Sequence, residues 1–443
     1  MKDQRPAVIL IFIFLVSIVL LVKLFTIQVL DDSFLKRAER NAIQRIVDHP
    51  YRGLIYDRHG KLLVYNNPIF DLMVVPKEFK VEDTVQFCKL FKIEKEALIE
   101  AYTAAKKYSP VKPSPLIKQI STTDFARIQD FLVDYPGLFI MTRSVRSYPN
   151  STAPHALGYI GEISAGQLER DSASYYSQGD YVGLSGLERY YENELRGRKG
   201  VKYKMVNVRG VDKGPFKEGE YDTASVAGKN ITSTIDMELQ RYGELLMSGK
   251  KGSVVAIEPK TGEILAMISA PFYDPNELTG AEFSKTYRRL NADEEKPLFN
   301  RPIMATYPPG SIFKIVQSLI GLQEGVLTPN TTLPCNRSLV ACHNHPNPVN
   351  LFGAIRNSCN PYYHQAYRMM INRGLSSNTF KDTELGLNAW REKVLKFGLG
   401  GTLGIDMYGE RGGDIPSSEY YDKVYKPGGW KYSTIYSLSI GQG

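Results

Sequence analysis

Residues 307–314 read Tyr307-Pro308-Pro309-Gly310-Ser311-Ile312-Phe313-Lys314 and lead into a largely apolar run that ends at Leu322. The Pro-Pro-Gly part cannot be helical, whereas the apolar run is typical of a buried helix. Ser311 is therefore predicted to lie at a helix amino terminus, where free N–H groups and the helix dipole favour a developing anion. Lys314 lies one turn further along, on the same face of the helix.

This pair has the chemistry of a nucleophile and its base. A serine hydroxyl is a weak nucleophile until a neighbouring group takes its proton, and burial beside a helix amino terminus disfavours the charged form of a lysine. The alternative is a helix cap beside a lysine that extends to solvent. Spacing alone does not decide, because three other pairs match Ser-x-x-Lys without a preceding Pro-Gly break: Ser33/Lys36, Ser109/Lys112 and Ser248/Lys251.

A second polar segment, Asn357-Ser358-Cys359-Asn360-Pro361, separates two apolar helix-like stretches at 351–355 and 362–371. Because proline disfavours helix in the residue before it, Ser358 and Asn360 are predicted on a turn that can direct both side chains into a cleft. There, a hydroxyl could relay a proton to a leaving amine, and an amide could hold a substrate carbonyl. Ordinary turn and cap chemistry is the alternative. A further match, Ser376-Ser377-Asn378, lies in a linker and is discounted.

Together, Ser311-x-x-Lys314 and Ser358-x-Asn360 resemble the first two active-site motifs of penicillin-binding proteins and serine β-lactamases. The resemblance covers nearly the whole chain and is greatest to the elongation-type class B proteins. It rests also on segments similar to that family's pedestal domain and to a later part of its transpeptidase domain: Arg52–Gly60, Arg146–Pro149, His155–Tyr159, Gly183–Gly197 and Ser439–Gly443.

The resemblance implies a peptidoglycan D,D-transpeptidase in which Ser311 attacks the penultimate D-Ala carbonyl of a stem peptide. A second strand's amine would then take the acyl group, and β-lactams would acylate the same serine. No cofactor is required. The family's third motif, Lys-Thr/Ser-Gly, is expected after Gly443, so we expect a carboxy-terminally incomplete chain with little turnover of its own. The earlier Lys260-Thr261-Gly262 precedes the nucleophile and is predicted to be a hairpin turn instead.

A cluster of soft ligands precedes the second motif and comprises Cys335, Cys342, His343 and His345. Thiolates and imidazoles at short spacing suit a structural zinc ion. A Cys335–Cys342 disulfide would hold the same loop in an exported protein, and unlinked side chains are the third alternative. Cys359 is either another ligand or a buried residue.

The amino terminus carries an apolar segment, Ala7 to Val22, extended by Leu24 and Phe25. No small-residue cleavage site follows, which favours an uncleaved transmembrane anchor over a signal peptide. Basic residues precede the segment and acidic residues follow it, so the bulk of the chain is predicted outside the membrane. This topology implies a single-pass protein of the bacterial inner membrane.

The predicted fold is α+β: an anchor at 1–25, an elongated mixed pedestal domain at 26–227 and a penicillin-binding, β-lactamase-like transpeptidase domain at 228–443 that lacks its last strands. Residues 32–46 have helical periodicity, and Asp236 can cap a helix that begins at Met237. The net charge of +8 is dispersed among acidic residues, which does not favour nucleic-acid binding.

The resemblance also implies partners: peptidoglycan stem peptides, β-lactams, the lipid bilayer and a membrane glycan polymerase of the SEDS type. Two other functions remain open. One is a non-catalytic scaffold that activates such a polymerase, and the other is a β-lactam sensor. A bifunctional enzyme is not expected, because residues 30–230 contain no Glu-Asp-x-x-Phe motif for glycosyl transfer.

Overall fold

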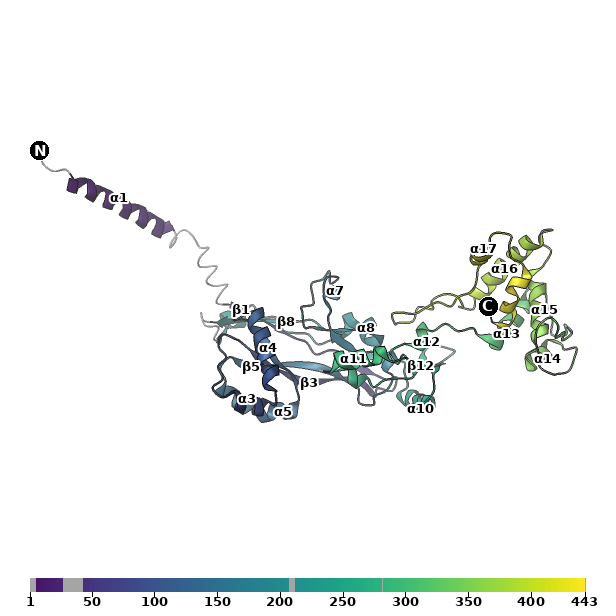
Figure 1. The fold of residues 1–443 in the computed structure, drawn as a ribbon, viewed down its shortest axis with the longest axis horizontal. Coiled ribbons are helices and arrows are strands. Elements are labelled where there is room, and N and C mark those ends of the chain that lie inside the picture. Colours follow the sequence, from purple (N-terminus) through teal and green to yellow (C-terminus); the bar gives the residue numbers. More distant parts are fainter. Residues whose placement is uncertain (1–4, 27–42, 207–211, 281, 443) are drawn as a thin grey trace. The chain divides into compact units, whose positions relative to one another are not determined.

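A computed structural model describes residues 5–26, 43–206, 212–280 and 282–442 (Figure 1). The chain forms two compact units. The first comprises Met1–Lys250 and Val255–Leu298, and the second comprises Lys251–Val254 and Phe299–Gly443.

The amino-terminal helix α1 (Arg5–Phe25) covers the apolar segment found in the sequence. Where the side chains of α1 are described, from Phe12 onward, they are exposed. No helix among the residues described here is both long enough and apolar enough to cross a membrane. Most of the helix predicted at 32–46 falls outside the described residues. Its last part was predicted wrongly, because Ile43–Asp48 form strand β1 and pair with β8 (Gly200–Val206).

Mainly antiparallel sheets form the frame of the first unit. The central strand β3 pairs with β5 along ten consecutive residue pairs, from Tyr65–Ser147 to Val74–Leu138. The strands, besides β1 and β8, are β2 (Ile55–Tyr56), β3 (Leu62–Val74), β4 (Ser114–Ile120), β5 (Leu138–Ser147), β6 (Ile160–Glu162), β7 (Tyr181–Gly183), β9 (Asp212–Pro215), β10 (Ile231–Thr232), β11 (Gly252–Ile257) and β12 (Ile264–Ala270). The predicted hairpin around Lys260-Thr261-Gly262 is confirmed, since β11 pairs with β12.

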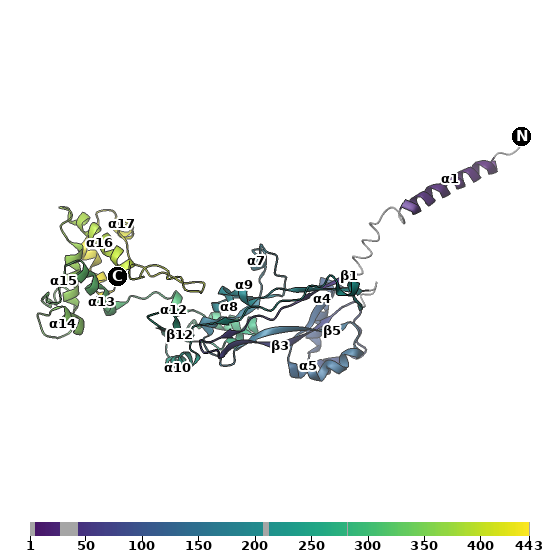
Figure 2. The same cartoon turned by 180° about the vertical axis from the view of Figure 1, so that it is seen from behind.

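Helices cover one end of the β3–β5 sheet, as both views show for α4 and α5 (Figures 1 and 2). Leu72 and Val74 of β3 pack there against Phe87 and Phe91 of α3 and Leu98 of α4. Full burial of each such side chain contributes about 1.5–3 kcal/mol. The helices of this unit, besides α1, are α3 (Thr84–Phe91), α4 (Lys95–Tyr108), α5 (Thr122–Ile128), η2 (Gln129–Asp134), α6 (Pro154–Leu157), α7 (Ala165–Leu168), α8 (Gly186–Tyr190), α9 (Glu192–Leu195), η3 (Phe216–Gly219), α10 (Met237–Met247), η4 (Pro275–Leu278) and α11 (Phe283–Ala292).

Two of the sequence signals in this unit have clear structural roles. Asp236 caps α10 as predicted, because its carboxylate accepts the N–H groups of Glu238 and Leu239. Arg52 and Arg146 converge on the buried carboxylate of Glu188, at 2.6 and 2.7 Å. Three of the segments that resemble a pedestal domain, at 52–60, 146–149 and 183–197, therefore meet in one buried ion-pair network.

Within its described residues, the second unit consists mainly of helices. They are α12 (Arg301–Met304), η5 (Gly310–Ile312), α13 (Phe313–Gln323), α14 (Leu351–Arg356), α15 (Asn360–Ile371), α16 (Thr379–Leu395), α17 (Ser418–Tyr425), α18 (Tyr432–Ile435) and η6 (Tyr436–Ile440). An aromatic core that includes Phe313, Tyr367 and Trp390 holds α13, α15 and α16 together.

Hydrogen bonds across this core fix the position of α13. Trp390 donates its indole N–H to Gln317 Oε1 at 2.8 Å, and Gln317 Nε2 donates to the carbonyl of Leu438 at 3.1 Å. Buried polar groups are costly unless they are paired, so these contacts specify one register of α13 against its neighbours. The helix that follows Ser311 is therefore rigidly held.

Candidate active site

The turn that carries Ser311 follows directly from its sequence. Pro308 and Pro309 prevent an earlier helical start, and Gly310 has a φ of +62°, a conformation that favours glycine. Ser311 lies in η5 and is exposed, and α13 begins two residues later. The predicted position of Ser311 at a helix amino terminus is thus confirmed, with a 3₁₀ turn as its first element.

Lys314 is buried beneath this turn, with 2% of its surface exposed. Its Nζ lies 2.8 Å from the carbonyl of Ser358, 3.0 Å from Ser358 Oγ and 2.6 Å from Asn360 Oδ1. Burial lowers the pKa of Lys314, although the nearby thiols of Cys342 and Cys359 oppose this effect. The neutral amine that a base requires is therefore more accessible than in a solvated lysine.

Ser358 completes a connection between nucleophile and base. Its Oγ donates to Ser311 Oγ at 3.0 Å while it accepts from Lys314 Nζ. The backbone of Ser358 has a φ of +46°, which is uncommon for a residue other than glycine. The residue sits on the turn between α14 and α15, where the sequence predicted it. A proton can pass between Ser311 and Lys314 through this hydroxyl.

Asn360 is oriented from two sides. Its Nδ2 donates to the carbonyl of Ala341 at 2.9 Å, which leaves Oδ1 directed at Lys314. Ala341 belongs to the cysteine- and histidine-rich loop, and the sequence contained no signal for its contact with Asn360. The structure therefore brings the four predicted site residues together and adds a loop that positions one of them.

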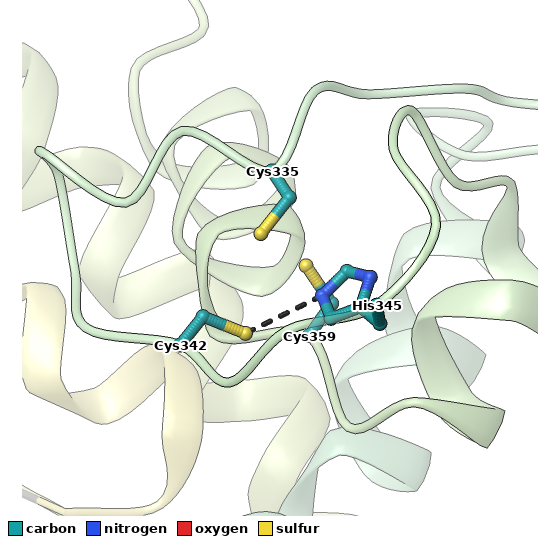
Figure 3. A group of neighbouring side chains, drawn as sticks. All are labelled: Cys335, Cys342, His345 and Cys359. Carbon is teal, nitrogen blue, oxygen red and sulfur yellow. Dashed lines mark hydrogen bonds between the residues drawn. The ribbon is translucent and has the colours of Figure 1, made fainter.

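Soft ligands form a second cluster (Figure 3), and one of them, Cys359, lies between Ser358 and Asn360 in the sequence. The sulfur atoms of Cys335, Cys342 and Cys359 and a ring nitrogen of His345 all lie within 4.8 Å of one another. His343 lies outside this group, contrary to our expectation from spacing, and Cys359 provides the fourth group instead. All four cysteines of the chain are free thiols, so the disulfide alternative is not formed.

The donor set fits a structural zinc ion. Three cysteines and one histidine are a common tetrahedral combination, whose sulfur atoms lie roughly 3.7 Å apart when bonds to zinc are ~2.3 Å. The Nδ1 of His345 lies 2.7 Å from the carbonyl of Pro346, which favours a proton on Nδ1 and leaves Nε2 to face Cys342 at 3.4 Å. Only a small contraction would be needed to close the site.

The surroundings of Cys342 and Cys359 affect the ionisation of these two thiols in opposite directions. Burial opposes ionisation of Cys342, but hydrogen bonds from the Asn360 N–H, His345 and Cys335 outweigh it and lower the pKa of that thiol. Burial raises the pKa of Cys359 to about 12. Cys359 lies between Ser358 and Asn360 in the sequence, so any ion bound here would also fix the second motif.

Comparisons with known proteins cover both units. A family model described as the penicillin-binding protein dimerisation domain matches residues 47–233, and one described as the penicillin-binding protein transpeptidase domain matches residues 252–441. The peptidoglycan D,D-transpeptidase MrdA of Haemophilus influenzae is 32% identical over 99% of this chain and 67% of its own length. The MrdA protein of Escherichia coli K12 is 31% identical over 99% of this chain and 69% of its own length.

Solved structures agree in fold. Penicillin-binding protein 2 of Helicobacter pylori, in a complex with MreC, superposes with a TM-score of 0.72 at 24% identity over 90% of this chain and 73% of that chain. A chain from a study of polymerization and crosslinking by a peptidoglycan synthase complex superposes with a TM-score of 0.65. That chain is 26% identical, and the match covers all of this chain and 75% of that one.

Proposed function

The chain belongs to the penicillin-binding proteins, in the branch of penicillin-binding protein 2, and from that premise we propose that it cross-links peptidoglycan stem peptides through an acyl-enzyme on Ser311. The observation that carries this proposal is the hydrogen-bonded series from Ser311 Oγ through Ser358 Oγ to Lys314 Nζ, with both steps at 3.0 Å. The relatives of this chain are named as peptidoglycan D,D-transpeptidases. The role that we propose for this activity is cross-linking during cell elongation.

In the first half-reaction, Ser311 Oγ attacks the carbonyl carbon of the penultimate D-Ala. Its proton passes through Ser358 to the neutral amine of Lys314. The C–N bond to the terminal D-Ala breaks, and the proton returns along the same path to the leaving amine. The developing oxyanion is favoured by the amino-terminal end of α13.

In the second half-reaction, the amine of another strand attacks the ester carbonyl. It loses its proton to Lys314 through Ser358 and forms a new amide bond. The C–O bond to Ser311 breaks, and the proton returns from Lys314 through Ser358 to Ser311 Oγ. Asn360 keeps Lys314 in place through both steps and offers its amide to the substrate. β-Lactams enter the first half-reaction with their ring amide and stop at the ester.

A fluorescent penicillin tests this proposal on the full-length gene product. The wild-type protein should be labelled covalently, and Ser311→Ala should not be labelled. The control is Ser318→Ala, which removes a buried hydroxyl on α13 that bonds to the Lys314 carbonyl and to Tyr363. Equal labelling of the wild-type protein and Ser311→Ala would exclude Ser311 as the nucleophile.

We further propose that α1 anchors the chain in the bacterial inner membrane, with the pedestal at 26–227 and the transpeptidase domain at 228–443 outside. The support is the apolar sequence from Ala7 to Val22, with basic residues before it and acidic residues after it. A membrane glycan polymerase of the SEDS type is the proposed partner, since one similar chain comes from a peptidoglycan synthase complex. Co-purification with such a polymerase from membranes tests the partner, and the same experiment on a variant lacking residues 1–25 tests the anchor.

We also propose a structural zinc ion at Cys335, Cys342, His345 and Cys359. When bound, it would neutralise the thiolates and join the loop at 335–345 to the turn that carries Ser358. The loop fixed in this way would hold Asn360 through the hydrogen bond from Asn360 Nδ2 to the Ala341 carbonyl, whether or not substrate is present.

A further inference from the structure

A pocket of about 450 Å³ lies in the second unit along α15, the helix that begins at Asn360. We call it the α15 pocket. Its walls come from α15, from the amino terminus of α16, from α18 and η6, and from Leu339 of the cysteine-rich loop. A volume of this size suits an organic group rather than a single small ion.

The lining of the α15 pocket is polar and cationic. Arg368 and Lys431 reach into it from α15 and from the residue before α18, and no acidic residue lines it. Within the part of the chain that the structure describes, neither cation has an ion-pair partner. Arg368 instead lies over the ring of Tyr432 at 5.8 Å, where its charge stays available to a ligand.

His364 provides independent evidence of a polar binding site in this pocket. Only 9% of this lining residue is exposed, yet its Nδ1 has no hydrogen-bond partner among the described residues. The rings of Tyr432 and Tyr436 hold the imidazole, at centroid distances of 5.2 and 5.7 Å. A buried polar atom without a partner is costly, so a group that hydrogen-bonds to it would be favoured.

The amino terminus of α16 adds its dipole. Asn378 already accepts the N–H groups of Phe380 and Lys381, so the helix contributes partial positive charge rather than free donors. Arg368, Lys431, the His364 imidazole and this dipole together favour an anionic ligand. The tyrosine rings and Leu339 offer apolar surface beside it, which suits a peptide that bears a carboxylate.

The position of the pocket indicates which peptide this is. Ser358 handles the proton of the incoming amine, and α15 starts at the turn that carries Ser358. His364 and Arg368 lie four and eight residues beyond Asn360, or about 6 and 12 Å along the helix at ~1.5 Å per residue. Two to four extended peptide residues of roughly 3.3 Å each cover that distance.

We propose that the α15 pocket binds a carboxylate of the acceptor stem peptide, the strand whose amine attacks the acyl-enzyme. This inference rests on the proposed transpeptidase function and names a subsite for its second substrate. Arg368 and Lys431 are positioning residues here, since they bind the acceptor away from the reacting atoms.

The test uses the full-length protein with a soluble peptide donor and a soluble acceptor peptide. In Arg368→Gln and Lys431→Gln, the KM for the acceptor should rise by about tenfold, the effect of losing one charge-assisted hydrogen bond. The kcat and the rate of acylation by fluorescent penicillin should stay unchanged. Lys396→Gln, an exposed lysine at the end of α16, makes the same charge change outside the pocket and should alter neither value.

Two further arms identify the ligand. An acceptor whose carboxylates are amidated should bind the wild-type protein about tenfold more weakly and should be insensitive to Arg368→Gln. Inorganic phosphate should compete weakly with the free-acid acceptor. The inference is overturned if the acceptor KM is unchanged in both variants or if amidation of the acceptor has no effect. It is also overturned if the pocket binds phosphate but not the carboxylate of the acceptor. Loss of penicillin labelling in the wild-type protein would instead overturn the proposed function itself.

Discussion

Lys314 Nζ lies 2.6 Å from Oδ1 of Asn360, and this contact joins the base of the site to the second motif. An amide oxygen at that distance stabilises a protonated lysine only modestly. Burial acts in the opposite direction and lowers the pKa of Lys314. The balance between these two effects decides how much neutral amine is present at the pH of the cell exterior.

Asn360→Asp should move this balance toward the charged lysine. A carboxylate in place of the amide favours the ammonium form and raises the pKa of Lys314. Because the neutral amine is the base, the acylation rate rises with pH through this pKa. The rising limb should therefore shift to higher pH, and the rate near neutral pH should fall about tenfold or more. The measurement is the rate of penicillin acylation against pH.

Asn350→Asp is the matched control for that experiment. Asn350 caps α14 by accepting the N–H of Gly353, a role that aspartate fills equally well. It makes the same chemical change on the neighbouring helix without touching Lys314. A pH profile of Asn360→Asp that coincides with the Asn350→Asp profile would contradict the role assigned to Lys314.

The glycine turn beside Ser311 depends on a distant segment. Gly310 donates its N–H to the carbonyl of Gly441 at 2.9 Å, and a Cβ on Gly441 would lie 2.5 Å from Gly310 O and 2.8 Å from Phe313 Cβ. Gly441→Ala should displace the turn, reduce penicillin acylation at least about tenfold and destabilise the protein by about 1–3 kcal/mol. Acylation kinetics and thermal melting measure the two effects.

Gly374→Ala separates the steric clash from backbone strain. Gly374 has a φ of +74°, close to the +69° of Gly441, but a Cβ there would meet no atom within 4 Å. It should cost stability through strain alone and leave acylation unchanged. If the two variants lose acylation equally, the contact between residues 310 and 441 does not position the nucleophile.

The sequence was sufficient for the catalytic residues because their positions depend on local breaks. Pro308 and Pro309 delay the helical start to Gly310, the first residue of η5. Pro361 predicts a break before it, and Ser358 lies on that turn, whereas Asn360, predicted on the same turn, is the first residue of α15. Helix periodicity then puts Lys314 under Ser311. Neither step requires knowledge of distant parts of the chain.

Other features depend on contacts between segments and could not be predicted. Cys335 and Cys342 meet Cys359 only because the loop folds back onto the turn before α15, and spacing cannot distinguish His343 from His345. Ile43 to Ile46 show helical periodicity but form β1, since pairing with β8 outweighs local preference. The carbonyl of Ala341 reaches Asn360 because the same loop folds back onto the turn before α15.

The two histidines offer a direct test of the zinc proposal. His345→Ala should lower zinc affinity by more than about a hundredfold, because even a residue that only supports a ligand is worth ~10–100-fold. His343→Ala should leave affinity unchanged, since its ring packs at 5.3 Å from His345 without joining the ligand atoms. Metal analysis after dialysis against a zinc-buffering chelator measures both variants.

Cys88→Ser is the control for the thiols, because Cys88 lies in the first unit, away from the cluster. It should keep a full equivalent of zinc, whereas Cys342→Ser should not. A wild-type protein that holds no zinc would exclude the metal site. Loss of zinc in His343→Ala but not in His345→Ala would show that His343, and not His345, is the zinc ligand.

Removal of one partner from the ion-pair network of the first unit should strongly destabilise that unit. Glu188 is fully buried between Arg52 and Arg146, which donate to its two carboxylate oxygens at 2.6 and 2.7 Å. Glu188→Gln keeps the shape but leaves two buried guanidinium groups facing a neutral amide. Removing one member of a buried pair costs about 3–5 kcal/mol, so thermal melting should show a large loss. Glu277→Gln breaks the exposed pair with Arg289 and should change little.

The same residue predicts how stability depends on pH. Burial opposes ionisation of Glu188, but Arg146 and Arg52 outweigh it, so the pKa of the folded protein is lowered below the usual 4.5. A carboxyl whose pKa is lowered on folding contributes its full stability above the unfolded pKa and loses it as pH falls through the folded one. Wild-type stability should therefore drop on the acid side, and Glu188→Gln should lose part of that dependence while Glu277→Gln keeps it. Parallel acid transitions in wild-type protein and Glu188→Gln would show that the two arginines do not hold Glu188 ionised.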